Sequence, residues 1–482
     1  MSERPLDLAV TGGTVVGPHG RRRVDLGVRD GCVVARVAPG TLGPALATCD
    51  ANGMLVLPGI VDTHFHCRAP ERPDREDFDS GTAAAAAGGV TTLVEMPISD
   101  PVCSTPEVLA ARMDLARRQA RIDVGLHVAV GDLDRPRLQE MVDAGAVAFK
   151  AMMHAAPPGR EASFRGLAIP DDGTLYRALE AVAETGRVLM VHAEHQELID
   201  LFERRERVAG QHDGMAHARS RPVVAEASAV ARIASMNEAV GARLHIVHLS
   251  SARAAEYVAW FRGRGQTITA ETTPAYLFAD LGDVERHGPF VKVNPPLRSR
   301  ADGEALMGAL KRGVLDTIAS DHAPFRGSEK EAAREDIWAA GSGIPSVELT
   351  GPLLWDAALR GVCTFEQAVA WASAQPASLF ELHAAKGHLD VGADADFVLV
   401  DPDAETEVRR DRLHSRSADA MRHVLGRRLR GRIGSVWSRG RIAFDGERVR
   451  ADPGDGAVIR PVTGPDVAST PDAASNAAAV RL

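Results

Sequence analysis

Residues 55–66, LVLPGIVDTHFH, form an apolar run that ends in two histidines separated by one residue. Such a run is typical of a buried strand, and on a strand the side chains of residues i and i+2 project from the same face. His64 and His66 can therefore reach one metal ion. A His-x-His pair is a weak signal by itself, but here it lies where a strand gives way to a polar loop. In a barrel of alternating strands and helices, that position is the catalytic rim.

Seven further apolar runs alternate with segments of helical period after Pro58, which indicates a parallel sheet with helical crossovers. They are TTLVEM (91–96), DVGLHVAV (123–130), AVAFK (146–150), RVLMVHAE (187–194), RLHIVHLS (243–250), QTITAE (266–271) and LDTIASDH (315–322). Together with GIVDTHFH (59–66) they make eight, which predicts a closed TIM-type (β/α)8 barrel. Helices are expected at 106–120, after a Ser104 or Thr105 cap, and at 174–185, ending at Gly186.

The two ends of the chain are rich in short β runs and lack a helical pattern. We expect residues 1–57 and 388–455 to form a small β-sandwich domain together, with the barrel at 58–387. The last stretch, 456–482, is low in bulky apolar residues, and we expect it to be a disordered tail.

The composition excludes several classes of protein. The net charge is -9, and the only Arg-rich stretch is short (422–432), which argues against a nucleic-acid partner. No run approaches the roughly 18 apolar residues that a membrane span needs, and the N-terminus MSERPLDLAV lacks an export pattern. The five cysteines are scattered without CxxC spacing, so neither a disulfide framework nor a cysteine zinc site is indicated. We therefore expect a cytoplasmic protein.

The strand-end position of the first two histidines recurs at His192, His248, Asp321 and Lys150, each of which ends an apolar β run. For any one of them a core histidine, a helix cap or a lysine reaching out to solvent is the ordinary explanation. Six such residues together are hard to obtain by chance. Nitrogen and oxygen donors of this kind suit zinc or a related transition ion.

Lysine is the unusual member of this set, because an ammonium group repels a cation. Reaction of the neutral Lys150 amine with carbon dioxide would give a carbamate, an anion with two oxygens that can bridge two ions. Six ligands then divide between two divalent ions. Such a pair lowers the pKa of a bridging water and polarises a carbonyl group. A site with these properties is suited to amide hydrolysis.

With these residues located, the chain resembles the cyclic amidohydrolases, which include hydantoinases, dihydropyrimidinases, allantoinases and dihydroorotases. The resemblance extends to about residue 450, and its motifs occur in family order. They are PGIVDTHFH (58–66), SGTAAAAAGGVTTLVEMP (80–97), AGAVAFKAMM (144–153), VHAE (191–194), HIVHLSS (245–251), KVNPPLRS (292–299) and ASDHAPF (319–325).

This resemblance implies a complete metal site and a homo-oligomer, a homodimer or homotetramer. The implied ligands of two divalent ions, most simply zinc, are His64, His66, Lys150 as a carbamate, His192, His248 and Asp321. Water held between the ions would attack the ring carbonyl, while Asp321 accepts its proton and passes it to the leaving nitrogen. Thr272, Asn294 and Ser342 lie where family members contact the ring, although such residues are also common turn formers.

The choice of ring rests on fewer residues. Arg68 completes the pattern His-x-His-x-Arg, which is similar to dihydroorotases, where this arginine binds the substrate carboxylate. Two other carboxylate-binding positions of that subfamily differ, because Ile98 and Phe325 stand there. The tyrosine that follows the lysine in D-selective hydantoinases is also absent from KAMMHAAPPG (150–159). The resemblance therefore favours a small cyclic amide of the allantoin or hydantoin type, a five-membered ureide, with dihydroorotase as the alternative.

Two other functions remain open. A non-catalytic scaffold of this fold would have lost its metal ligands, whereas all six positions here hold residue types that can bind metal. A single-metal deaminase of the same superfamily would use the histidines and Asp321 but would not need Lys150. The lysine therefore discriminates between these alternatives.

Overall fold

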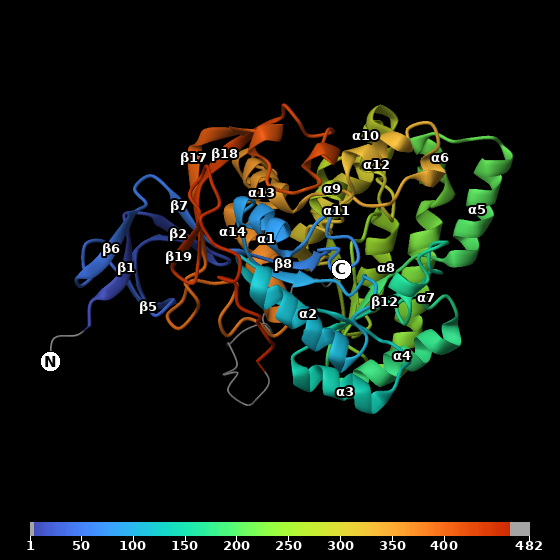
Figure 1. The fold of residues 1–482 in the computed structure, drawn as a ribbon, viewed down its shortest axis with the longest axis horizontal. Helices are drawn as coiled ribbons and strands as arrows, with labels where there is room; N and C mark the ends of the chain where they lie inside the picture. The colour runs from blue at the N-terminus through green and yellow to red at the C-terminus, as the bar shows by residue number, and fades with distance from the viewer. Residues whose placement is uncertain (1–3, 463–482) are drawn as a thin grey trace, which may run out of the picture.

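The computed structural model describes residues 4–462, and Figure 1 shows a barrel surrounded by helices with a group of β-strands on one side. Each predicted barrel run contains a strand. The barrel strands are β8 (Ile60–Phe65), β9 (Val90–Glu95), β10 (Asp123–Leu126) with its continuation β11 (Val128–Ala129), β12 (Phe149–Met152), β13 (Leu189–His192), β14 (Leu244–Ile246), β15 (Ile268–Thr272) and β16 (Thr317–Ile318).

The barrel closes between its first and last strands. Neighbouring strands pair in parallel from β8 to β10 and from β11 to β16. A parallel bridge joins Phe65 to His322, and the backbone N–H of His66 donates to the carbonyl of His322 at 2.9 Å. The predicted TIM-type barrel is therefore confirmed, and the carboxyl ends of all its strands meet at one rim.

Fifteen α-helices lie in the described residues, most of them outside the barrel strands. They are α1 (Phe78–Ala87), α2 (Pro106–Gln119), α3 (Arg135–Ala144), α4 (Asp172–Thr185), α5 (Gln196–Val208), α6 (Gly214–Ser220), α7 (Val223–Val240), α8 (Ala252–Arg262), α9 (Pro274–Phe278), α10 (Leu281–His287), α11 (Arg300–Lys311), α12 (Gly327–Ala332), α13 (Thr350–Leu359), α14 (Phe365–Val369) and α15 (Gln375–Leu379). Among them, none is both long and apolar enough to cross a membrane.

Both predicted helices form, with small differences at their ends. Helix α2 is capped by Thr105, whose hydroxyl accepts from the N–H of Val108. Helix α4 begins at Asp172, earlier than expected, because Asp171 serves as its cap; it ends at Gly186, whose φ of 70° suits a glycine.

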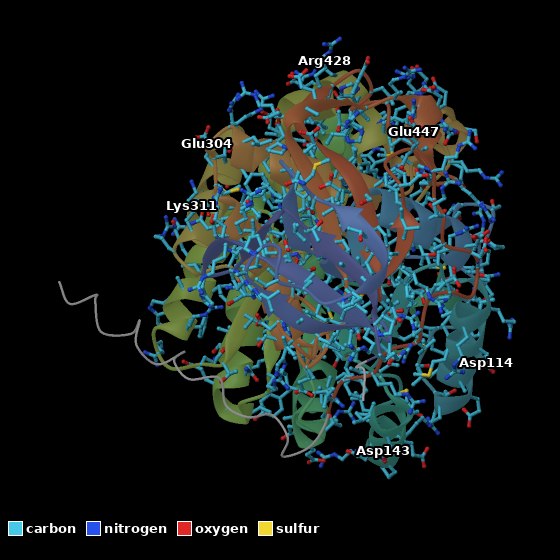
Figure 2. The ribbon with its side chains drawn as sticks, turned by 90° about the vertical axis from the view of Figure 1, so that its left-hand side faces the viewer. Asp114, Asp143, Glu304, Lys311, Arg428 and Glu447 are labelled. Atoms are coloured by element: carbon cyan, nitrogen blue, oxygen red, sulfur yellow. The ribbon has the colours of Figure 1, made fainter. Side chains whose placement is uncertain are left out.

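The small β-sandwich is built from both ends of the chain. Its strands are β1 (Leu6–Thr11), β2 (Thr14–Gly17), β3 (Gly20–Arg23), β4 (Asp25–Arg29), β5 (Cys32–Val37), β6 (Ala45–Asp50), β7 (Leu55–Pro58), β17 (Phe397–Glu407), β18 (Arg428–Ser438) and β19 (Arg441–Phe444). They form one sheet in the order β5-β4-β1-β6 and another in the order β19-β18-β17-β7-β2-β3. Leu8 and Val28 of the first sheet share a buried cluster with Phe397 of the second, and Figure 2 shows these strands in front of the barrel helices.

A buried ion cluster joins the sandwich to the barrel. The ammonium of Lys386 lies 2.6 Å from a carboxylate oxygen of Asp123, where β10 begins, and 2.7 and 2.8 Å from those of Asp394 and Asp396, just before β17. These three aspartates could hold a metal ion by their spacing, but the Lys386 ammonium already lies within 2.8 Å of an oxygen of each.

The expected tail is ordered where the structure describes it. Residues 456–462 run beside β10: the N–H of Val124 donates to the carbonyl of Ala457 at 2.8 Å, and the N–H of Ile459 donates to that of Val124 at 2.9 Å. The prediction of disorder from residue 456 is therefore wrong for this part, because backbone groups hold it. Residues 463–482 of the expected tail lie outside the described residues.

Candidate metal centre

Three of the predicted ligands meet at the rim of the barrel. Asp321 follows β16, and its carboxylate oxygen Oδ1 lies 3.3 Å from Nε2 of His64 and 3.5 Å from Nε2 of His66. These ligand atoms are close enough to share one ion. Adjacent strands bring the three together, because β8 and the end of β16 close the barrel.

Two further predicted ligands form a second group beside the first. Nδ1 of His192, at the end of β13, lies 2.8 Å from Nε2 of His248, which follows β14. The His248 ring also lies beside that of His64, with 5.3 Å between the ring centroids. The five side chains therefore form a continuous group of donor atoms across the rim.

The backbone is strained at two of these residues. His248 has a φ of 39° and Asp321 has a φ of 46°, and Arg68, just after the first histidine pair, has a φ of 65°. Non-glycine residues adopt this left-handed region rarely and at a cost, and such residues cluster at functional sites. This strain supports a functional role in which the required position of the side chain outweighs the cost of the backbone conformation.

Lys150 lies inside the barrel without a hydrogen-bond partner for its amine among the described residues. Its strand β12 pairs with β11 on one side and β13 on the other, with Lys150 opposite Ala129 and Met190. Burial lowers the pKa of the Lys150 amine to about 8, although the carboxylates of Glu271 and Asp321 oppose this shift. A part of the amine is therefore neutral near pH 7.

Two buried glutamates each contact one ring nitrogen of a predicted histidine ligand. Nδ1 of His64 is bonded to Glu271, and Nε2 of His192 lies 2.8 Å from Glu194. Arg221 pairs with Glu194 in turn. A carboxylate behind a histidine fixes the tautomer and leaves the other nitrogen for an ion. The sequence interpretation did not assign these glutamates, although both end β runs that it identified, VHAE and QTITAE.

The protonation states suit cation binding. Burial lowers the pKa of His66, His192 and His248 well below the usual range, so these imidazoles are neutral. Burial also raises the pKa of the Asp321 carboxyl, whereas His64 and Lys150 favour its charged form. Neutral imidazoles, a carboxylate and a partly neutral amine fit divalent ions of the zinc type.

The donor group forms the floor of a cavity of about 1230 Å³. Three of the four predicted substrate residues, Arg68, Asn294 and Ser342, line this cavity. Thr272 does not: its buried hydroxyl donates to the carbonyl of Leu249 at 2.9 Å. Thr272 is therefore not among the residues that line the cavity, because its side chain faces Leu249, which follows β14.

Cations and one aromatic ring line the same cavity. The guanidinium of Arg75 pairs with Glu329 at 2.7 Å and lies 4.3 Å from the centroid of the Phe325 ring. Arg68 lies 5.6 Å from the same ring and makes no side-chain hydrogen bond within residues 4–462. Burial and the charges of Arg160 and Arg75 lower the pKa of Arg68 to about 9. An unpaired buried cation therefore faces the cavity.

The chain is similar to known proteins over most of its length. The model of the amidohydrolase family matches residues 55–442. An allantoinase of Rubrobacter xylanophilus is 37% identical over 458 residues, which cover 94% of this chain and 98% of that protein. An L-hydantoinase of Paenarthrobacter aurescens is 34% identical over 404 residues, covering 83% and 87%. The solved L-hydantoinase (dihydropyrimidinase) from Arthrobacter aurescens aligns with a TM-score of 0.90 at 32% identity, covering 94% of this chain and 100% of that one.

Proposed function

Because this chain belongs to the amidohydrolase family and is a hydrolase of cyclic amides, we propose that it opens a five-membered ureide ring with two bound divalent ions, most simply zinc. The observation that carries the proposal is the Lys150 amine, buried beside the histidine and aspartate donors without a partner. As a carbamate formed with carbon dioxide and loss of a proton, this side chain would offer anionic oxygen ligands to the ions. His64, His66, His192, His248 and Asp321 would supply the remaining ligands.

Asp321 is the proposed acid and base. When bound, the two ions would activate a water molecule and polarise the ring carbonyl. Asp321 takes a proton from the water while the water oxygen attacks the carbonyl carbon of the ring. It then gives that proton to the ring nitrogen as the C–N bond breaks. Glu271 and Glu194 keep His64 and His192 in the tautomers that ligation needs.

The proposed ring follows from the relatives and from the cavity wall. The two relatives described above are named for allantoin and hydantoin, which are both five-membered ureides. Ile98 and Phe325 line the cavity with apolar surface, which suits a neutral ring. Asn294 and Ser342 supply polar groups beside it.

A ring that carries a carboxylate, such as dihydroorotate, is the second candidate. The observation that favours it is Arg68, whose buried guanidinium faces the cavity without a carboxylate partner. A charge-assisted contact with a substrate carboxylate would satisfy this cation.

We also propose that the chain is a cytoplasmic homodimer or homotetramer that acts on small molecules. The five cysteines of the chain are unpaired, as is usual in a reducing compartment. Trp260 on α8 is 54% exposed beside Tyr257, and such an apolar surface supports self-association. Light scattering of the purified protein measures the oligomeric state.

One experiment ranks the substrates. Protein loaded with zinc is incubated with allantoin, hydantoin, 5-substituted hydantoins, dihydrouracil and dihydroorotate, and kcat/KM is compared. We expect the neutral five-membered rings to give the highest values. A clear preference for dihydroorotate would replace the proposal with its alternative, and no turnover of any ring by metal-loaded protein would favour the scaffold.

A further inference from the structure

This chain uses lysine sparingly, and nearly every lysine is buried. Only five of its 56 Lys and Arg residues are lysines. Lys311 on α11 is exposed, whereas Lys150, Lys292, Lys330 and Lys386 are buried. Lys150 belongs to the proposed metal centre, and Lys386 is surrounded by three aspartates. The proposed reaction gives no role to Lys292 and Lys330.

Both of these amines bind the same short segment of backbone, residues 337–343, which we call the wall loop. Lys292 comes before it in the chain, in the motif KVNPPLRS, and Lys330 lies in α12. Each amine donates to two carbonyl oxygens of the wall loop. Lys292 binds those of Ile337 and Ala340, both at 2.7 Å, and Lys330 binds those of Gly341 and Gly343, both at 2.8 Å.

The hydrogen-bond acceptors of these two amines are unusual for buried lysines. Buried lysines are normally paired with carboxylates, since an uncompensated charge is costly away from water. Within residues 4–462, neither Lys292 nor Lys330 has a carboxylate oxygen within 4.0 Å. Their N–H groups are instead directed at backbone carbonyls of one loop, and the Lys330 nitrogen lies 5.0 Å from the centroid of the Phe325 ring. The amines therefore serve the loop and not a carboxylate.

The wall loop is confined from its other side as well. A Cβ atom added at Gly341 would lie 2.1 Å from a ring atom of Phe325, and one added at Gly343 would lie 2.5 Å from the carbonyl oxygen of Ala323. The N–H of Gly343 also donates to the carbonyl of Lys292 at 2.8 Å. The loop thus packs closely against Phe325 while the two amines hold its carbonyls.

This loop forms part of the cavity. Its residues 338–343 line the same cavity as the donor group, with Ser342 between the two residues whose carbonyls Lys330 binds. The Lys292 side chain lines the same cavity. Any movement of the loop would therefore change the shape of the space that receives the ring.

We propose that Lys292 and Lys330 are positioning residues that hold the wall loop in its ring-binding shape, so that they determine substrate affinity and choice of ring substituent and leave the hydrolytic step largely unchanged. The kinetic part of this inference rests on the proposed function. The structural part, an ordered loop held by two amines, does not.

The test compares Lys292→Met and Lys330→Met with Lys311→Met, which removes the exposed lysine. Hydrogen exchange of metal-loaded protein without substrate should become faster in peptides covering 337–343 in the first two variants and stay unchanged in the third. With the best ring of the substrate panel, KM should rise by about tenfold or more while kcat changes by less than about threefold.

Three further variants keep the test decisive if a methionine variant does not fold. Lys292→Gln and Lys330→Gln retain N–H donors and should show smaller rises in KM. In Gly341→Ala, the added methyl group meets the Phe325 ring and should displace the loop without changing either amine. This variant should therefore also show the rise in KM. Unchanged exchange at 337–343 would overturn the inference, as would a fall in kcat at constant KM. If no ring of the panel is hydrolysed, the proposed function fails and the exchange result still decides whether the amines hold the loop.

Discussion

Lys150 is the residue that separates a two-ion hydrolase from a one-ion deaminase. Its buried amine has no hydrogen-bond partner among the described residues. We predict that Lys150→Ala loses bound metal and most activity, because the bridge between the ions is gone, and that acetate or propionate partly restores both. Elemental analysis and kcat measure the two effects. Full activity with one firmly bound ion in this variant would favour the deaminase.

Arg68 decides between neutral and anionic rings. Because its guanidinium is buried and unpaired, a substrate carboxylate bound to it would make its loss costly. For dihydroorotate we would then expect Arg68→Met to lower kcat/KM by about 10²-fold or more. For neutral ureides, which we expect to be the better substrates, the loss should be only a few-fold. Best turnover of dihydroorotate, with selective loss of that turnover in Arg68→Met, would contradict this prediction.

Lys292 gives the stability of the fold a pH dependence. Burial lowers its pKa from 10.5 to about 7, with Arg221 and Arg207 acting in the same direction and Glu203 and Asp336 opposing. Between about pH 7 and pH 10.5 the unfolded chain therefore binds more protons than the folded one, so this residue makes the free energy of unfolding rise with pH. Wild type should gain stability from pH 7 to pH 9.5 relative to Lys292→Met, measured by urea unfolding. Lys311→Met is the control, and a parallel response of wild type and Lys292→Met would contradict the assignment.

The sequence indicated the proposed metal ligands better than it indicated the residues that contact those ligands. His64, His192 and Asp321 could be found because each ends an apolar run, and the carboxyl ends of parallel strands meet at one rim. Glu271 ends such a run too, but a carboxylate behind a histidine cannot be distinguished from a ligand without its distance to the ring. Thr272 follows it and faces Leu249 instead, since neighbouring side chains on a strand point to opposite sides.

Elements with a clear hydrophobic period were predictable, and segments held by backbone groups were not. The β runs that became β8 and β13 carry their own signal in apolar residues. Residues 456–462 have few bulky side chains, yet their N–H and C=O groups bind to β10 and its neighbours. Composition does not show backbone pairing along a strand edge, so the sequence indicated disorder there.

The segment 456–462 should contribute to the stability of the barrel. Its Gly456 N–H donates to the carbonyl of Ala120, its Ala457 N–H to the carboxylate of Asp123, and its Val462 N–H to the carbonyl of Glu381. We predict that truncation after residue 455 lowers Tm by several degrees, because a few hydrogen bonds of about 1 kcal/mol each are lost. Truncation after Val462 is the matched control, since it keeps each of these bonds. Equal Tm values for the two truncated proteins would contradict the prediction.

At the scale of the molecule, the two ends of the chain meet in one sheet, where β7 pairs with β17. The sequence indicated this arrangement, because both ends are β-rich. It could not give the pairing register or the Lys386 cluster, which depend on contacts between residues distant in the chain. That cluster fixes the sandwich to the barrel at Asp123, at the start of β10 and so at the amino end of the strands, away from the rim that carries the proposed metal ligands. The contact between the sandwich and the barrel is thus separate from the proposed metal site.

The same separation leads to a prediction for metal removal. The large buried cluster of the barrel includes Phe149, Leu189 and Ile246, whereas the ligand-type side chains lie at the rim, so the core does not depend on bound ions. We predict two divalent ions per subunit by elemental analysis, and loss of activity on chelation with little change in the far-ultraviolet circular dichroism. Single replacement of His64 or His248 by alanine should likewise abolish most activity without unfolding the barrel. Activity in demonstrably metal-free protein would refute the two-ion mechanism, and loss of native circular dichroism in these variants would show that the histidines serve the fold instead.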